Sequence, residues 1–272
     1  MNSEKPVRFL DRTTPPHIIT LVVLAGLSAT AMNIFLPSLP EMSEYFETEY
    51  RIMQLSVALY LAVSALLLLV IGPISDSLGR RPVLIGGLIA FLLATLGCIF
   101  STSIESFLFF RMCQAMIAVA MAVSRAVIRD MFSQERAASM IGYVAMGMAI
   151  VPMISPAIGG ILSQFFGWEA TFWALFALGA LTLWLTWIDL GETLQSTGKS
   201  LRAQFGEYPE LFRSPRFWGY ALASGLSSGS FFAYLGGAPF VGSEVFNLDP
   251  ATLGAFIGAP AIGYFAGNFL TG

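Results

Sequence analysis

Long stretches with almost no charged residue alternate with short polar segments along this sequence. Eight of the apolar runs approach the roughly 20 residues that a helix needs to cross the hydrocarbon layer of a bilayer. The runs cover residues 18–40, 53–72, 82–101, 105–128, 138–164, 169–189, 216–238 and 252–271. A lipid-exposed backbone must satisfy its own hydrogen bonds, and the runs lack the short alternation of a membrane β-barrel. We therefore predict an all-α polytopic membrane protein.

The composition agrees with this interpretation. Of the 272 residues, 56% are hydrophobic and only 11% are charged, whereas soluble domains carry about a quarter of charged residues. Cys98 and Cys113 both lie in apolar runs, where we expect small packing residues rather than a disulfide or a metal site. With a single histidine, His17, and neither H-E-x-x-H nor G-x-x-x-x-G-K-[ST], the sequence predicts no enzyme activity, no cofactor, no metal and no nucleic-acid partner.

The distribution of positive charge predicts the orientation in the membrane. Cytoplasmic loops collect Lys and Arg, and a cytoplasmic N-terminus places twelve of the fourteen Lys and Arg residues on the inner side. Arg51 then lies outside, and Arg111 lies within a span. The opposite orientation inverts this ratio. We therefore predict a multi-pass membrane protein with its N-terminus in the cytoplasm.

The segment GPISDSLGRRP (72–82) concentrates charge and turn-forming residues between two apolar runs. We expect Gly72 to end the second helix, because glycine permits backbone conformations that close a helix. Gly79 is expected to lie within the turn, and Pro82 is expected to open the third helix, since proline suits a first helical turn. The segment is thus predicted to be a cytoplasmic turn.

The charges of this turn have candidate partners. Asp76 precedes Arg80 by four residues, a spacing at which the two side chains can pair. Asp130, at the cytoplasmic end of the fourth span, is a second candidate partner for Arg80. Such a cluster predicts a breakable ionic connection between helix ends on the inner face, which is the property of a gate.

A short repeat suggests an internal duplication. SEYF at 43–46 recurs as SEVF at 243–246, and each follows a helix that ends in aromatic residues and proline. The charged stretch between the two copies is typical of a linker. We predict an N-terminal six-helix bundle (1–190), a cytoplasmic linker (191–215) and the first two helices of an incomplete C-terminal bundle (216–272).

The repeat also predicts how much of a complete fold the chain contains. An offset of 200 residues places Gly272 on Gly72, after only two helices of the second half. About 8 of an expected 12 helices are then present, in an arrangement of parallel halves known from transporters. This leaves open the alternative that the chain is a truncated fragment that transports nothing.

Three motifs resemble those of the major facilitator superfamily. GPISDSLGRRP resembles its G-x-L-x-D-R-x-G-R-[RK] loop, with Ser77 in place of the usual basic residue, and FFRMCQA (109–115) resembles its R-x-x-Q-G. SPAIGG (155–160) is similar to the G-P-x-x-G-G signature of its antiporters, with Ser155 in place of glycine. The residues that match the loop motif are Gly72, Asp76, Gly79, Arg80 and Arg81.

With FLPSLP, RAVIRDMF and FFAYLGGAPF, these motifs resemble the branch of drug:proton antiporters that confers resistance to bicyclomycin and chloramphenicol. The resemblance implies a fold of twelve helices and secondary transport. It also implies a place in the bacterial inner membrane and export of small hydrophobic molecules in exchange for protons. A proton-coupled symporter that imports a small metabolite is the alternative in the same fold, and we expect a monomer in the bilayer.

Arg111 is the only charged residue within a span. A mid-bilayer Arg costs about 2.5–3.5 kcal/mol on insertion scales, so it is expected to face protein or a water-filled cavity. Gln114 lies on the same helical face, and the alternative is an Arg111 side chain that extends to the outer surface. The resemblance implies a buried cation that organises the substrate site.

Asn33 stands where related antiporters carry Asp, and Asn cannot titrate. The candidates for proton coupling are therefore Glu105, Glu244 or an acid of the missing helices.

The fifth predicted helix carries proline and glycine at a regular spacing. Proline kinks a helix and small residues let a neighbouring helix approach closely. The residues concerned are Pro152, Pro156, Gly159 and Gly160, and the resemblance implies that they line the contact between the halves.

Aromatic and methionine side chains suit an adaptable apolar pocket. The candidates for lining it are Tyr60, Met146, Phe232 and Tyr234.

Overall fold

The chain is almost entirely helical in a computed structural model that describes residues 7–14, 16–131, 134–194, 205–206 and 208–260, with part of the side chains in 134–153. The helices are α1 (Ile18–Asn33), α2 (Leu39–Tyr45), α3 (Tyr50–Met53), α4 (Leu55–Leu78), α5 (Arg80–Ile99), α6 (Ile104–Gln114), α7 (Ala118–Met131), α8 (Gln134–Phe166), α9 (Glu169–Asp189), α11 (Tyr208–Arg213), α12 (Pro215–Phe240) and α13 (Pro250–Gly258). Short helical turns cover Leu36–Ser38 (η1), Ala115–Ile117 (η2) and Val241–Val245 (η3). The described residues include no strand.

Five segments are long and apolar enough to cross a membrane. They are Ile18–Tyr45, Tyr50–Leu78, Arg80–Ile99, Ile104–Met131 and Glu169–Asp189. The other three predicted runs are helical where the structure describes them, as α8, α12 and α13. The prediction of an all-α polytopic membrane protein is confirmed.

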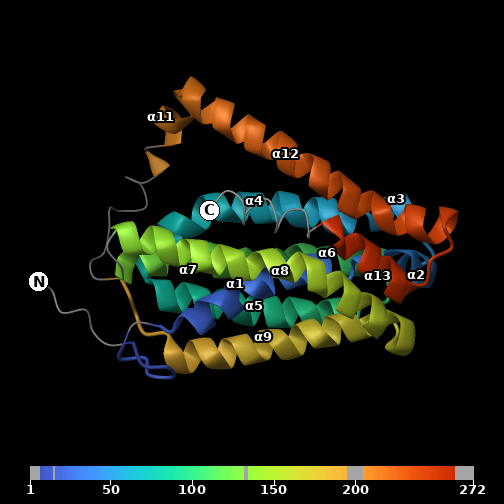
Figure 1. Ribbon diagram of the computed structural model, residues 1–272, viewed down its shortest axis with the longest axis horizontal. Helices are drawn as coiled ribbons and strands as arrows, with labels where there is room; N and C mark the ends of the chain where they lie inside the picture. The colour runs from blue at the N-terminus through green and yellow to red at the C-terminus, as the bar shows by residue number, and fades with distance from the viewer. Residues whose placement is uncertain (1–6, 15, 132–133, 195–204, 207, 261–272) are drawn as a thin grey trace, which may run out of the picture.

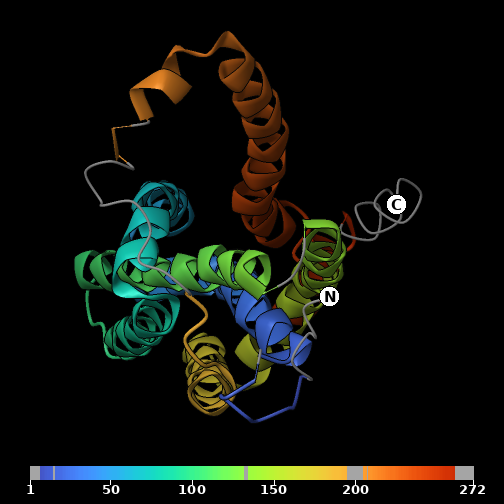
Figure 2. The same ribbon diagram turned by 90° about the vertical axis from the view of Figure 1, so that its left-hand side faces the viewer.

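The helices from α1 to α9 form one bundle, and α12 leans away from it (Figures 1 and 2). Within α12, only Leu235 and Pro239 are buried. Rings from α6, from α9 and from Phe46, the residue after α2, pack together at one end of the bundle. The ring centroids of Phe46 and Phe107 lie 5.3 Å apart, and those of Phe107 and Phe172 lie 5.6 Å apart. Such pairs contribute about 0.5–1.5 kcal/mol each beyond their buried area.

Glycines allow α8 to touch its neighbours backbone to backbone. A Cβ atom on Gly159 would lie 1.7 Å from the carbonyl oxygen of Ile34, and one on Gly160 would lie 2.0 Å from that of Pro250. A Cβ atom on Gly254 would lie 2.2 Å from the carbonyl oxygen of Pro156. The helix therefore packs against the end of α1 and against α13 only because these positions carry no side chain.

The sequence repeat is also a repeat of local structure. Ser43 donates its hydroxyl to the carbonyl of residue 40, and Ser243 donates to that of residue 240. Each copy is followed by a residue with positive φ, Glu47 at 47° and Asn247 at 50°. Glu49 and Asp249 then precede α3 and α13 as their N-cap residues. The division into 1–190, 191–215 and 216–272 stays a prediction.

The end of the second predicted helix differs from the sequence prediction. Gly72 does not end a helix, because α4 continues through Gly72 and Pro73 to Leu78. Proline removes one backbone donor from a helix, which leaves the carbonyl of Leu69, four residues earlier, without its usual partner. The hydroxyl of Tyr208 in α11 donates to that carbonyl at 2.5 Å. The prediction that Gly72 closes the helix was therefore wrong, and the turn is confined to Gly79, whose φ is 98°.

Candidate functional site

A cluster of charged side chains joins the ends of α4, α5 and α7, and we call Asp76, Arg80 and Asp130 the gate cluster. Nη1 of Arg80 pairs with the carboxylate of Asp76 and donates to Oγ of Ser75 at 2.6 Å. Nε of Arg80 donates to Oδ2 of Asp130 at 2.9 Å. The two ion pairs expected from the sequence are present, and Ser75 is a partner that the sequence did not indicate.

The positions around Arg80 explain this geometry. Gly79 has a φ of 98°, so the chain reverses within a single residue and α5 begins directly at Arg80. Pro82 consequently lies inside the first turn of α5 rather than before it. Arg81 is not part of the gate cluster, because its guanidinium donates to the carbonyls of Trp187 and Leu190 at the end of α9. A Cβ atom on Gly72 would meet nothing within 4 Å, so the structure shows no steric reason for glycine there.

A second cluster lies in the core around Arg111, which is 1% exposed. Its Nη1 donates to Oε1 of Gln114 at 2.7 Å, and its Nη2 donates to the carbonyl of Ala31 at 3.0 Å. The guanidinium carbon lies 4.2 Å from the ring centroids of both Phe35 and Tyr60. Arg111 therefore lies inside the protein, and the alternative of a side chain extended to the outer surface is wrong.

The central cluster, defined as Asn33, Phe35, Tyr60, Arg111 and Gln114, is held by α1, the residues just after it, α4 and α6. Gln114 also donates from Nε2 to Oγ1 of Thr95 at 2.8 Å, which connects α6 to α5. Among the described residues, no acid forms an ion pair with Arg111. Two aromatic faces, an amide and a carbonyl compensate its charge instead.

Two polar atoms of the central cluster have no partner. Nδ2 of Asn33 donates to the carbonyl of Ala29 at 2.7 Å, but its Oδ1 is buried without a hydrogen bond. Nε of Arg111 is likewise buried and unpaired. Buried polar atoms without partners are costly and uncommon. One acceptor and one donor of this cluster thus lack a hydrogen bond within the protein.

Phe35 belongs to this cluster and Thr95 accepts a hydrogen bond from it, although the sequence indicated neither residue. Phe35 is one of many aromatic residues of the chain, and Thr95 is one of several small polar residues within apolar runs. Only the position of Phe35 two residues after Asn33 connects it with a candidate. Nothing in the sequence distinguishes Thr95 from a packing residue.

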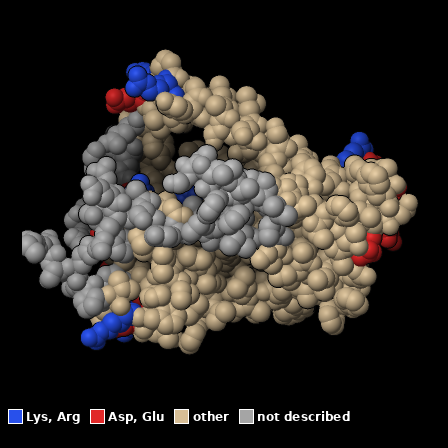
Figure 3. Space-filling model, viewed as in Figure 1, with Lys and Arg blue, Asp and Glu red and all other residues tan. Residues whose placement is uncertain are grey.

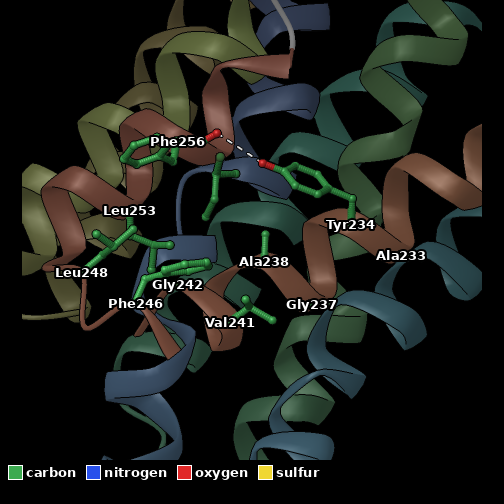
Figure 4. A pocket seen from close by; sticks show the side chains of 11 residues that line it. Ala233, Tyr234, Gly237, Ala238, Val241, Gly242, Phe246, Leu248, Leu253 and Phe256 are labelled. Atoms are coloured by element: carbon green, nitrogen blue, oxygen red, sulfur yellow. Dashed lines mark hydrogen bonds between the residues drawn. The ribbon is translucent and has the colours of Figure 1, made fainter. Parts of the chain in front are cut away.

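A separate apolar pocket of about 580 Å³ lies between α12, η3 and α13 (Figure 4). Tyr234 lines it and donates its hydroxyl to the carbonyl of Phe256 at 3.2 Å. The other walls are mostly aliphatic and aromatic, including Phe246 and Leu253. Of the predicted pocket residues, Tyr234 lies here, Tyr60 lies in the central cluster, and Phe232 packs against the core. The side chain of Met146 lies outside the described residues.

Acidic residues occupy the ends of the molecule. Charged side chains are visible at both ends of the face shown in Figure 3. Glu105 and Glu244, the candidates for proton coupling, are both exposed. Asp249 caps α13, and the hydrogen bond from the hydroxyl of Thr252, at 2.6 Å, lowers the pKa of this carboxyl.

The sequence profile described as Major Facilitator Superfamily matches residues 21–272. The uncharacterized MFS-type transporter YdgK of Bacillus subtilis is 30% identical over 262 residues, which cover 93% of this chain and 64% of the relative. A chloramphenicol resistance protein of Pseudomonas aeruginosa is 33% identical over 219 residues, or 78% of this chain and 51% of the relative. A bicyclomycin resistance protein homolog of Haemophilus influenzae is 25% identical over 250 residues, which cover 90% of this chain and 63% of the relative.

Solved structures show the same architecture. The human organic anion transporter MFSD10 superposes with a TM-score of 0.70 at 17% identity, over 92% of this chain and 70% of that protein. A bacterial homolog of the human lysosomal transporter Spinster, in an inward-facing conformation, superposes with a TM-score of 0.71 at 18% identity, over 93% of this chain and 61% of that protein. The chain spans between about half and two thirds of the curated relatives. It belongs to the Major Facilitator Superfamily and is a multi-pass membrane protein.

Proposed function

We propose that this protein exports hydrophobic drug-like compounds from the bacterial cytoplasm in exchange for protons, by alternating access. The observation that carries the proposal is Arg111, a buried cation between Phe35 and Tyr60 that keeps an unpaired donor. Relatives named for resistance to chloramphenicol and bicyclomycin support export of such compounds.

The central cluster suits a solute with both aromatic and polar parts. Phe35 and Tyr60 hold the guanidinium of Arg111 between their rings and surround it with apolar side chains, while the unpaired Nε of Arg111 and the unpaired Oδ1 of Asn33 can pair with polar groups of a solute. Small-molecule sites combine such walls with a few convergent polar groups. The cation favours solutes that present hydrogen-bond acceptors, because an additional positive charge would be repelled.

The gate cluster closes the end of the bundle that we predict to face the cytoplasm. Opening on that side requires Arg80 to separate from Asp76 and Asp130. Because these residues lie on α5, α4 and α7, their separation releases three helix ends from one another. Elsewhere in the bundle, α8 and α13 approach each other closely at Gly160 and Gly254, where no side chain stands between the two backbones. In our proposal, this contact permits the sliding that alternating access needs.

Protons supply the energy in this mechanism. One charge that crosses 100 mV gains about 2.3 kcal/mol. Asn33 cannot titrate, and the described residues place no acid beside Arg111. We therefore assign the coupling carboxylate to a position outside the central cluster.

Uptake of labelled chloramphenicol by cells that produce the chain tests this function. We expect lower steady-state accumulation than in cells with an empty vector, and we expect a protonophore to remove the difference. Higher accumulation would favour the symporter instead. Equal accumulation, with the chain present in the membrane fraction, would contradict export by this chain.

A further inference from the structure

The segment that follows α9 supplies a cap for α5. The carboxylate of Glu192 accepts hydrogen bonds from the backbone N–H of Arg80 at 3.0 Å and of Arg81 at 3.2 Å. It also accepts from the N–H groups of Thr193 and Leu194 in its own segment. The first N–H groups of a helix have no acceptor within the helix, and Gly79 at the N-cap has no side chain to offer one. Glu192 thus provides an acceptor and a negative charge where the helix dipole favours both.

Arg81 provides the reciprocal cap for α9. Its Nε donates to the carbonyl of Leu190 at 2.9 Å, and its Nη2 donates to that of Trp187 at 3.1 Å. The guanidinium also lies 5.0 Å from the ring centroid of Trp187. The last carbonyls of a helix lack donors within the helix, and a cation is favourable there. The start of α5 and the end of α9 therefore cap each other.

Gly79 is needed for this arrangement as well as for the turn. A Cβ atom at this position would lie 2.6 Å from Oε2 of Glu192 and 3.2 Å from its Cδ. The carboxylate could move away from such an atom only by giving up its hydrogen bonds to the start of α5. The glycine therefore leaves room for Glu192 in addition to permitting a φ of 98°.

A second residue from beyond α9 contacts the other helix of this turn. The hydroxyl of Tyr208 donates to the carbonyl of Leu69, which Pro73 leaves without its usual donor. Glu192 and Tyr208 both belong to the predicted linker (191–215), and they contact α5 and α4, respectively. The two helices that carry Arg80 and Asp76 are thus each bonded to the linker.

We propose that Glu192 is a positioning residue of the gate cluster and couples the position of the linker to the gate. Arg80 is bonded at both ends, since its backbone N–H donates to Glu192 while its guanidinium contacts Asp76 and Asp130. Movement of the linker away from α5 releases the backbone of Arg80 and weakens the contacts of its side chain. The proposal rests on the proposed function only in treating this cluster as a gate.

Labelling of a buried position under Arg80 tests the coupling. Ser75 is 1% exposed and accepts a hydrogen bond from Arg80, so the thiol in Ser75→Cys becomes reachable only when Arg80 moves. The full chain, with Cys98→Ala and Cys113→Ala, is labelled with a membrane-impermeant maleimide from the cytoplasmic side of inverted vesicles. Glu192→Gln should raise the labelling rate roughly three- to tenfold, the range for loss of partly solvated hydrogen bonds to a charged group.

Three further variants make the result specific. Glu210→Gln removes the same charge from an exposed position of α11 and should leave the rate unchanged. Glu192→Asp keeps the charge and should give a rate closer to that of the parent. Tyr208→Phe removes one hydroxyl and should raise the rate by less than Glu192→Gln. Gel filtration of each purified variant confirms that it is folded.

Asp130→Asn separates the two possible failures. If Asp130→Asn raises the labelling rate and Glu192→Gln does not, the coupling proposed for Glu192 is wrong while the gate survives. If neither variant raises it, the cluster is not a gate, and the coupling fails with it. A rise in both Glu192→Gln and Glu210→Gln would show a general effect of charge and would also overturn the proposal.

Discussion

The two charged clusters of this molecule differ in how their cations are neutralised. In the gate cluster, Arg80 faces two carboxylates, and the side chains of Asp76 and Asp130 are 31% and 24% exposed. In the central cluster, Arg111 is 1% exposed and contacts an amide, a carbonyl and two aromatic rings. Both arginine side chains are buried, Arg80 at 7% exposure, but Arg80 pairs with carboxylates that are partly exposed to water, whereas Arg111 pairs with no carboxylate among the described residues.

In the function we propose, this difference separates two tasks. A partly solvated ion pair contributes little, because water replaces the lost partner when the pair opens. A buried charge is costly unless its surroundings compensate for it, so a change beside it has a large effect. The gate cluster therefore suits repeated opening and closing, and the central cluster suits sensing what is bound beside it.

The largest effect is expected from Arg111→Ala. The variant loses two charge-assisted hydrogen bonds, each contributing about 1.5–3 kcal/mol, so transport should fall about 100-fold or more. Arg111→Lys should rescue little, because an ammonium cannot donate to Gln114 and Ala31 while stacking on two rings. The measurement is the initial rate of chloramphenicol efflux per amount of protein in the membrane.

Arg125→Ala is the matched control, because Arg125 lies exposed on α7 and carries the same charge. Its efflux rate should remain within about twofold of the parent, as is usual for a surface substitution. Full activity of Arg111→Ala would show that the central cluster is structural only and would remove the main support for the proposed site.

Asn33→Asp would make the central cluster resemble the gate cluster. Asn33 lies two residues after Ala31, whose carbonyl binds Arg111, and we expect the buried carboxylate to pair with the free Nε of this arginine. Efflux of neutral chloramphenicol should fall about tenfold, since the pairing occupies the free donor. Efflux of a cationic dye such as ethidium should rise. Unchanged rates for both compounds would show that Arg111 does not select substrates by charge.

The sequence predicted the gate cluster better than its surroundings. Opposite charges are so rare in this chain that Asp76, Arg80 and Asp130 stand out, and their pairing follows from their places at helix ends. Glu192 could not be found in the same way, because it lies 112 residues from Arg80 and resembles any acid of a linker. The end of α4 was misplaced for a similar reason, as the donor that compensates Pro73 comes from distant Tyr208.

The central cluster was predicted in part. Arg111 and Gln114 were indicated by the cost of a charge in a span and by helical spacing, and both lie in the cluster. Phe35 and Thr95 were not, since aromatic and small polar residues occur throughout the apolar runs and only packing selects among them. The apolar pocket near Tyr234 was not located either, because it depends on how far α12 leans from the bundle (Figure 2).

Smaller effects are expected from the gate cluster. Asp76→Asn and Asp130→Asn should each lower efflux several-fold without reducing the amount of protein in the membrane, because each leaves Arg80 with one carboxylate. Their effects should not add, since both act on the same guanidinium. The double variant, measured beside the two single ones, checks this. Efflux equal to the parent in all three variants would contradict a gating role.

The smallest expected effect is that of salt. Raising the ionic strength from about 0.15 M to 1 M shortens the Debye length from about 8 Å to about 3 Å, which weakens charges in contact with water and hardly changes buried ones. Labelling of Ser75→Cys should therefore rise about twofold at high salt. The rise should be smaller when Asp130→Asn is also present, because one of the screened pairs is gone. Binding of chloramphenicol at the central cluster should be insensitive to salt, since Arg111 is dry. An equal salt effect on labelling with and without Asp130→Asn would place the sensitive charges elsewhere and would end the distinction between a solvated and a buried cluster.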